Sequence, residues 1–202
     1  MKLSHILYKT NNLPKAVQQF EEEGFKVEYG SKHNPKNALI YFSEGPYIEI
    51  LEKAPISNFM MLLLRLIGKT HLVNRFKSWK NAQEGYFDIC LENYSNNFDD
   101  EVRILNEHNE NYFITNSSRL DPSNRFLKWK LLFPSNIQIP FFMTYFNINP
   151  KPQNFIHPND VSRIDKVSYG INSELQSIFC KLCSDEAIDL VQKKGVHNVI
   201  FK

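Results

Sequence analysis

Glycine is scarce in this chain, and its few occurrences form none of the patterns that mark common enzyme classes. The 202 residues contain only 7 glycines. None of them builds a glycine-rich phosphate loop or the Gly-x-Ser-x-Gly turn that presents a nucleophilic serine. The sequence therefore gives no support to a P-loop nucleotide-binding protein or to a serine hydrolase of that type.

Cysteine is also scarce, with three residues at positions 90, 180 and 183. An odd number without a regular framework does not indicate a disulfide scaffold, so we expect a reducing, cytoplasmic setting. Cys180 and Cys183 form a single Cys-x-x-Cys, whereas a structural zinc site needs a second pair. We therefore interpret them as ordinary buried residues on one face of a helix.

Long apolar runs and a charge excess are missing as well. The longest apolar run, Phe59 to Leu64, continues through Arg65 to Ile67, which is far short of the roughly 20 residues of a membrane-spanning helix. The 24 basic and 22 acidic residues leave a net charge of +2. The overall charge thus gives no reason to expect a nucleic-acid partner or an anionic membrane partner.

The sequence is rich in aromatic residues and in strand-like patterns. It has 16 Phe and 9 Tyr, which favour strands and aromatic-lined cavities. The first fifty residues predict a strand, a helix and three more strands, at Lys2–Tyr8, Pro14–Glu23, Phe25–Tyr29, Asn37–Phe42 and Tyr47–Leu51. Pro14 suits the first turn of that helix, and Gly24 suits its C-terminal end.

A second unit with the same order is predicted later in the chain. We expect its first strand at Gly85–Glu92 and its helix at Phe98–His108. Three further strands are expected at Tyr112–Thr115, Phe126–Phe133 and Phe141–Phe146. We therefore predict a first βαβββ unit at residues 1–53, a helical connection at 54–84, a second βαβββ unit at 85–147 and a proline-rich linker with a βα element at 148–202. Within that last segment we expect a strand near Arg163–Ile171, helices at Ser173–Cys183 and Ser184–Lys193, and a final strand near Val196–Phe201.

The helical connection carries an unusually apolar helix, predicted at Asn58–Ile67 with Gly68 as its stop. Phe59, Met60, Leu63, Leu64 and Ile67 give it a wide apolar face. We expect it to pack over the domain or to form a homodimer contact. We disfavour a membrane-surface anchor because the segment is short and not strongly basic.

Several stretches together resemble the glyoxalase-like domain family of the vicinal oxygen chelate (glyoxalase/bleomycin resistance/dioxygenase) superfamily. They are Leu3-Ser-His-Ile-Leu, Glu23-Gly-Phe-Lys-Val, Asn37-Ala-Leu-Ile-Tyr-Phe, Tyr47-Ile-Glu-Ile-Leu, Lys128-Trp-Lys-Leu-Leu-Phe-Pro, Pro140-Phe-Phe-Met and His157-Pro-Asn. The resemblance implies an α+β fold in which paired βαβββ units form a curved mixed sheet around a cleft. We read the C-terminal element as a partial third unit or a capping element.

The resemblance also implies a divalent metal between the two units, held by a His on the first strand and a Glu on the fourth strand of each half. His5 and Glu49 match these positions in the first half. Aligning the halves puts Phe87 and Thr144 at the corresponding positions of the second half, and neither is a suitable ligand. A site for Zn, Mn, Fe or Ni would therefore be incomplete.

His5 and Glu49 also form a candidate catalytic pair. If both face one cavity, we expect Glu49 to raise the pKa of His5, and the pair could act as a general base. Phe87, Lys130, Thr144 and His157 are candidate substrate-binding residues, although each also has a structural interpretation in the core, on a solvated face or in a turn.

Three functions follow from these patterns. The first is binding of a small organic molecule between the units, with or without acid–base catalysis by His5 and Glu49. The second is a metal-dependent lyase or dioxygenase. The third is a non-catalytic binding, resistance-type or assembly module that uses the Asn58–Ile67 helix as a dimer contact.

Overall fold

A computed structural model describes residues 1–53, 56–152 and 155–202 of the chain. The start of the predicted helical connection, residues 54–55, and residues 153–154 of the predicted linker lie outside this description. In the described ranges, no helix has the length and apolar character that crossing a membrane requires.

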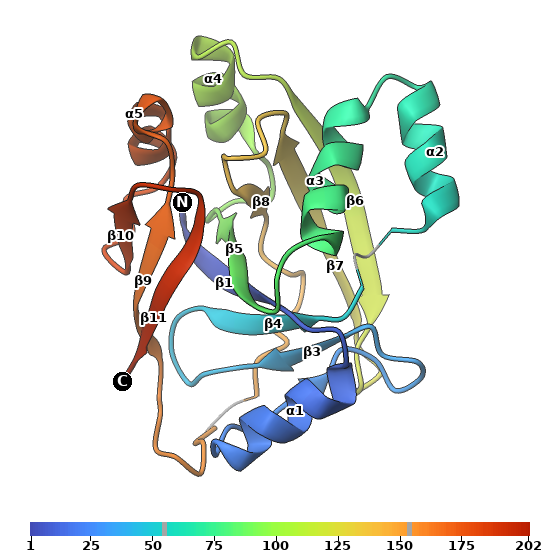
Figure 1. Ribbon diagram of the computed structural model, residues 1–202, viewed down its shortest axis with the longest axis vertical. Helices are drawn as coiled ribbons and strands as arrows, with labels where there is room; N and C mark the ends of the chain where they lie inside the picture. Colours follow the sequence, from blue (N-terminus) through green and yellow to red (C-terminus); the bar gives the residue numbers. More distant parts are fainter. Residues whose placement is uncertain (54–55, 153–154) are drawn as a thin grey trace.

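The first half of the chain folds as the predicted strand, helix and three strands (Figure 1). Asn12 caps the helix, because its side chain accepts a hydrogen bond from the Lys15 amide at 3.0 Å, and Pro14 lies in the first turn. Gly24 follows the helix with a φ of 85°, a left-handed conformation that favours glycine. The elements are β1 (Lys2–Lys9), α1 (Leu13–Glu22), β2 (Glu28–Tyr29), β3 (Asn37–Ile40) and β4 (Tyr47–Leu51).

The second half repeats this order, with a longer third element than the sequence predicts. Its elements are β5 (Gly85–Glu92), α4 (Asp99–Glu107), β6 (Tyr112–Leu120), β7 (Phe126–Pro134) and β8 (Phe141–Met143). The prediction ended β6 at Thr115, but its pairing with β7 continues to Leu120, opposite Phe126.

The two halves build one eight-stranded, curved sheet in the order β2-β3-β4-β1-β5-β8-β7-β6. The antiparallel pair β1–β5 joins the halves, and each of these strands lies parallel to the last strand of its own half. The sheet is therefore two copies of one strand order related by a pseudo-twofold axis. This arrangement confirms the predicted α+β fold with paired βαβββ units.

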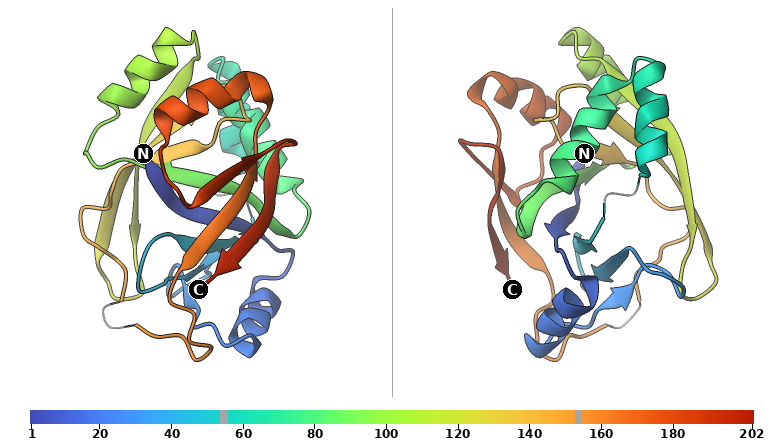
Figure 2. Two further views of the ribbon diagram at one scale, coloured as in Figure 1. Left: turned by 90° about the vertical axis from the view of Figure 1, so that its left-hand side faces the viewer. Right: turned by 45° about the vertical axis from the view of Figure 1, so that its right-hand side comes forward.

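Different elements cover the two faces of the sheet (Figures 1 and 2). One face packs against α1, α4 and the C-terminal element in a large apolar core that includes Ile6, Phe20 and Leu105. The other face carries Leu7, Phe141 and Met143, which pack with side chains of α2 (Asn58–Leu66) and α3 (Thr70–Lys80). The candidate site lies on this second face.

The C-terminal element is a small separate sheet with one helix. It contains β9 (Ile164–Gly170), α5 (Ser173–Leu182), β10 (Ile188–Val191) and β11 (Gly195–Phe201), in the strand order β10-β9-β11. The prediction of a helix at Ser184–Lys193 is wrong, because Ile188 to Val191 pair in parallel with Val167 to Gly170 of β9. Short apolar segments do not distinguish helix from strand by periodicity alone.

Candidate functional site

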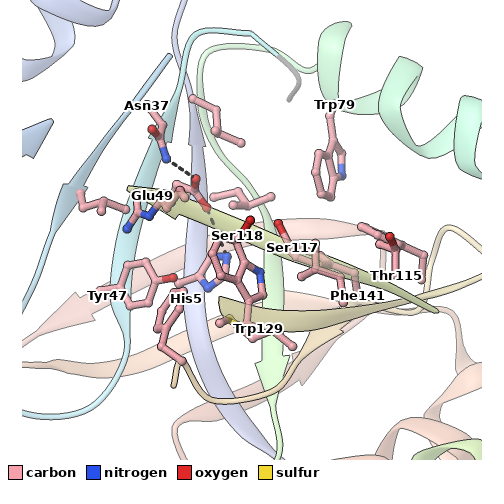
Figure 3. A pocket seen from close by; sticks show the side chains of 18 of the residues that line it. His5, Asn37, Tyr47, Glu49, Trp79, Thr115, Ser117, Ser118, Trp129 and Phe141 are labelled. Carbon is pink, nitrogen blue, oxygen red and sulfur yellow. Dashed lines mark hydrogen bonds and ion pairs between the residues drawn. The ribbon is translucent and has the colours of Figure 1, made fainter. Parts of the chain in front are cut away.

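A cavity of about 430 Å³ opens on the α3 side of the curved sheet, between the two halves (Figure 3). Its walls come from both halves, since His5 and Glu49 lie on β1 and β4 while Trp129 and Phe141 lie on β7 and β8. Aromatic and aliphatic side chains dominate the lining, and both halves contribute polar groups. This combination is typical of sites for small organic ligands. We call the part of the lining around His5, Asn37, Glu49 and Arg119 the polar end.

His5 is fixed in one orientation at the polar end of the cavity. Its side chain is buried, stacks on the Tyr47 ring at a centroid distance of 4.7 Å and meets the edge of Phe141 at 5.7 Å. Its Nδ1 atom lies 3.1 Å from Ser4 Oγ. Its Nε2 atom lies 3.4 Å from Glu49 Oε2 and has no hydrogen-bond partner within the described part of the chain.

The sequence analysis predicted the wrong direction for the pKa of His5. Burial disfavours the imidazolium, and the positive charge of Arg119 adds to this effect, so the pKa falls from 6.5 to about 3. The nearby carboxyl group of Glu49 does not overcome these two effects. His5 is therefore a neutral imidazole at physiological pH, able to donate or accept one hydrogen bond through Nε2.

Glu49 is the neighbouring ionisable group, and its environment pulls its pKa in two directions. Burial raises the pKa, while a hydrogen bond from Asn37 and the charge of Arg119 lower it, and the net direction is upward. Asn37 Nδ2 donates to Glu49 Oε1 at 2.6 Å. The side chain keeps 21% exposure, and it lines the cavity. A carboxylate with a raised pKa is a better proton acceptor than an ordinary one.

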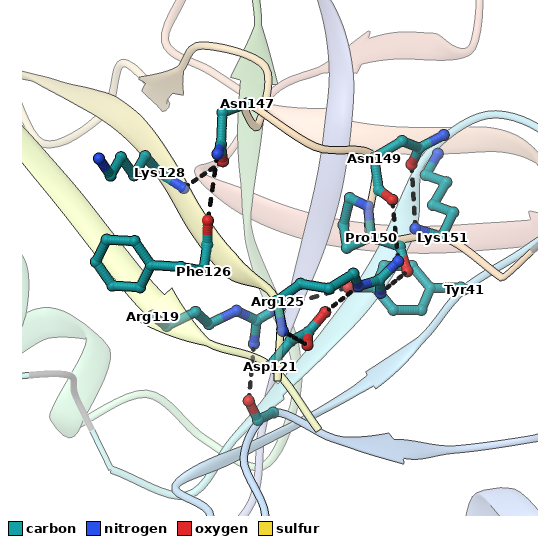
Figure 4. Close-up of polar contacts among 11 residues, drawn as sticks. Tyr41, Arg119, Asp121, Arg125, Phe126, Lys128, Asn147, Asn149, Pro150 and Lys151 are labelled. Atoms are coloured by element: carbon teal, nitrogen blue, oxygen red, sulfur yellow. Dashed lines mark hydrogen bonds and ion pairs between the residues drawn. The ribbon is translucent and has the colours of Figure 1, made fainter. Parts of the chain in front are cut away.

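Arg119 reaches the same polar end from β6 of the second half. It donates weak hydrogen bonds to the Gly30 carbonyl oxygen and to the Tyr41 hydroxyl, both at 3.4 Å (Figure 4). It also lines the cavity. The guanidinium thus supplies a fixed positive charge beside Glu49 and His5, suited to an oxygen of a ligand.

A bulge in β1 brings Ser4 next to His5. The β1–β5 register shifts between Leu3 and His5, and Ser4 Oγ also lies 3.3 Å from Glu92 Oε2 and 3.1 Å from Met143 Sδ. The hydroxyl has one proton. If the Ser4 hydroxyl donates to His5 Nδ1, the imidazole proton is on Nε2. If the hydroxyl donates to Glu92 or Met143 instead, the tautomer with the proton on Nδ1 is favoured.

The other predicted site residues lie away from this cavity. Lys130 and Thr144 border a more open groove along β7, where Thr144 Oγ1 accepts a hydrogen bond from the Lys130 amide at 2.9 Å. Phe87 packs against the Trp79 ring at 6.4 Å. His157 is buried, and its Nδ1 accepts a hydrogen bond from the Lys26 amide at 2.9 Å. Thus His5 and Glu49 are the predicted site residues that line the cavity.

The structure also corrects the alignment between the halves. The Thr10 amide bonds to the Leu51 carbonyl at 3.0 Å, and the Asn93 amide bonds in the same way to Met143 at 3.2 Å. The counterpart of His5, five residues before Thr10, is therefore Asp88, and the counterpart of Glu49 is Phe141. The earlier assignment of Phe87 and Thr144 to these positions is wrong.

The bulges agree with this register. The β1–β5 pairing skips Ser4 on one strand and Phe87 on the other, and these two residues directly precede His5 and Asp88, which are equivalent positions in the two halves. An alignment error of one residue between two strands is hard to detect from the sequence when either register gives each strand an acceptable pattern of buried and exposed side chains.

These counterparts do not fit a four-ligand metal centre. Phe141 has no ligand atom, and the Asp88 carboxylate accepts hydrogen bonds from Trp79 Nε1 at 2.9 Å and from the Tyr169 hydroxyl at 3.2 Å. In the described residues, no group of three or more His, Cys, Asp or Glu side chains could hold a metal ion. His5 and Glu49 remain the only predicted ligands that face each other.

Sequence reasoning missed several groups of the cavity. Trp129 of β7 and Trp79 of α3 both line the cavity. Ser117 and Arg119 belong to the part of β6 that was not predicted. Alternation of half-buried and exposed residues along β6 places Thr115, Ser117 and Arg119 on one face, and this spacing was the available signal.

Comparison with known proteins identifies a family and a fold. A family model described as a glyoxalase-like domain matches residues 3–176. The structure is similar to that of a hypothetical protein from Staphylococcus aureus, with a TM-score of 0.66, 17% identity and coverage of 99% of this chain and 90% of that chain. At this identity the likeness shows the fold alone.

A weaker likeness is to methylmalonyl-CoA epimerase from Streptomyces coelicolor, with a TM-score of 0.42, 12% identity and coverage of 71% of this chain and 95% of that chain. Comparison with curated protein sequences gives no significant match.

Proposed function

This chain belongs to the glyoxalase-like domain family of the vicinal oxygen chelate superfamily, and we propose that its cavity binds a small organic molecule and moves a proton on it. The observation that carries the proposal is the placement of Glu49 and neutral His5 3.4 Å apart at the polar end of an otherwise apolar cavity. The ligand has an apolar body and an oxygen-bearing head.

The two groups have different roles in this proposal. Glu49 is the general base, because its raised pKa keeps it reactive toward protons and Asn37 holds one of its oxygens. His5 stays neutral and donates a hydrogen bond from Nε2 to the oxygen of the ligand head. A carboxylate base beside a neutral imidazole is an established combination for removing a proton next to a carbonyl.

The proposed reaction class is proton transfer within the ligand, as in an isomerisation. Glu49 takes a proton from the ligand, the electron pair shifts toward the ligand oxygen, and the proton returns to the same or a neighbouring atom. Arg119 and the His5 N–H stabilise the negative charge that develops on this oxygen. No oxidant or reductant is needed.

Intrinsic fluorescence provides a direct test of binding. The chain has two tryptophans, and both Trp79 and Trp129 line the cavity. A thermal-shift screen of small carbonyl compounds and carboxylic acids should yield ligands that raise the melting temperature and change tryptophan emission. Leu131→Phe should weaken this binding by filling the cavity, whereas Ile200→Phe, on β11, is the matched control and should not.

Hydrogen exchange tests the chemistry. When a ligand found in this way is incubated with the protein in heavy water, one of its C–H hydrogens should be replaced by deuterium. NMR spectra of the ligand would show this exchange. Glu49→Gln should bind the ligand but lose the exchange. Exchange that persists unchanged in Glu49→Gln would contradict the assignment of the base.

Sequestration of a ligand is a second candidate function. The predominantly apolar lining favours it, because such a cavity can hold a molecule without chemistry. Tight binding without any exchange in the wild-type protein would select this alternative over proton transfer.

A further inference from the structure

Helix α2 exposes an apolar surface that the fold leaves uncovered. Phe59, Leu66 and Ile67 are 69%, 75% and 65% exposed, and Met60, Leu62 and Leu63 are also exposed. In Figure 1 the helix lies at the edge of the molecule beside α3 and away from the β9–β11 sheet. Exposed apolar clusters of this kind mark sites of interaction.

The helix is nevertheless well formed and anchored. Ser57 caps it, with its hydroxyl accepting a hydrogen bond from the Met60 amide at 3.1 Å, and Gly68 ends it with a φ of 76°. Leu64 is buried against the cluster that includes Leu72 and Phe76 of α3. Of the apolar side chains expected to pack over the domain, only Leu64 is buried. The exposed ones fall in an arc of about 160° on another side of the helix.

The chain segment that contains this face carries charges of one sign. No Asp or Glu occurs between Glu52 and Glu84. Arg65, Lys77 and Lys80 are exposed, and Lys69 is half-buried. None of the ion pairs found in the described residues involves these four side chains. Asn58–Ile67 by itself has only one cation, Arg65, which is why the sequence did not favour a membrane-surface role; the basic character arises when α3 is included.

This charge pattern argues against a second copy as the occupant of the surface. In a twofold dimer the same patch meets itself. The cations of this segment would then face a segment of the other copy that has cations but no acidic side chain to pair with them. Like charges placed together across an interface oppose association.

We propose that α2 docks on the surface of an anionic lipid bilayer, lying in the plane of the interface. Its exposed apolar side chains would enter the boundary between headgroups and acyl chains, and the exposed cations Arg65, Lys77 and Lys80 would face the lipid phosphates. An apolar helical face flanked by cations is the arrangement that favours such binding. The helix lies on the bilayer and does not cross it.

Sedimentation with vesicles tests the proposal. The full-length protein should sediment with vesicles of phosphatidylcholine mixed with phosphatidylglycerol, and more weakly with phosphatidylcholine alone. Leu62→Glu/Leu66→Glu should weaken binding to the anionic vesicles by roughly tenfold or more. Ile200→Glu, a change of an exposed side chain on β11, is the matched control and should bind like the wild type.

A charge variant and a size measurement complete the test. Lys77→Gln/Lys80→Gln should weaken binding to the anionic vesicles and leave binding to phosphatidylcholine unchanged, with circular dichroism confirming that each variant is folded. Absence of vesicle binding by the wild type would overturn the proposal. A dimer in solution that Leu62→Glu/Leu66→Glu dissociates, without vesicle binding, would identify a second copy as the occupant instead. Neither outcome depends on the chemistry proposed for His5 and Glu49.

Discussion

Replacing His5 by Gln should remove a specific part of the pH dependence of stability. The folded state holds the pKa of His5 at about 3, whereas the ordinary value is 6.5. As the pH falls below 6.5, the unfolded chain takes up a proton on this residue while the folded protein does not. Stability therefore declines with falling pH through the window from 6.5 to about 3, and this group contributes no pH dependence above it.

The size of the effect follows from the difference between the two pKa values. Each unit corresponds to about 1.4 kcal/mol, so the wild type should lose roughly 2 kcal/mol from this residue between pH 7 and pH 5. The full window amounts to roughly 5 kcal/mol. His5→Gln has no such group. The difference in unfolding free energy between wild type and variant should therefore shrink by roughly 2 kcal/mol between pH 7 and pH 5.

Urea denaturation followed by tryptophan emission measures this difference. If the unfolding free energy of both proteins depends equally steeply on urea concentration, the two unfolding reactions are comparable. His33→Gln, at an exposed position, is a matched control for the exchange of an imidazole for an amide. The same difference in unfolding free energy between wild type and His5→Gln at both pH values would show that His5 titrates normally and would refute its burial as a neutral group.

The remaining predictions concern the polar end of the cavity. Glu49→Gln should raise the melting temperature at neutral pH, because it removes a carboxyl group whose pKa is raised by burial; a lower melting temperature would contradict this. Gly30→Ala should weaken ligand binding, since the added methyl group would lie 2.8 Å from Asn37 Cγ and displace the partner of Glu49; titration by fluorescence would detect it. Ser4→Ala should shift the tautomer of His5 in ¹⁵N NMR spectra, and an unchanged spectrum would exclude Ser4 from this role.

The fold could be predicted from the sequence because its local signals agree with each other. Asn12, Pro14 and Gly24 delimit α1, and period-two alternation identifies β1 and β4. The repetition of the same order in the second half then fixes the paired architecture. His5 and Glu49 were found because the family resemblance implies a His on the first strand and a Glu on the fourth strand, and both strands are well marked in the sequence.

The rest of the site was hidden because tertiary pairing overrides local preference. Residues 116–119, Asn-Ser-Ser-Arg, have weak strand propensity, and β6 continues through them because they pair with Leu127 to Lys130 of β7. This continuation is what carries Ser117 and Arg119 to the cavity. The pKa of His5 was predicted in the wrong direction because burial, which no sequence pattern reveals, outweighs the neighbouring carboxyl group.

The central claim is that a ligand occupies the cavity between the two halves, at His5 and Glu49. The most direct measurement is a crystal structure of the protein with a ligand from the thermal-shift screen. We predict that the ligand head lies within hydrogen-bond distance of His5 Nε2 and Glu49, with its apolar body against Trp79 and Trp129. A ligand bound instead in the groove beside Lys130 and Thr144, with the cavity at His5 empty, would contradict the account.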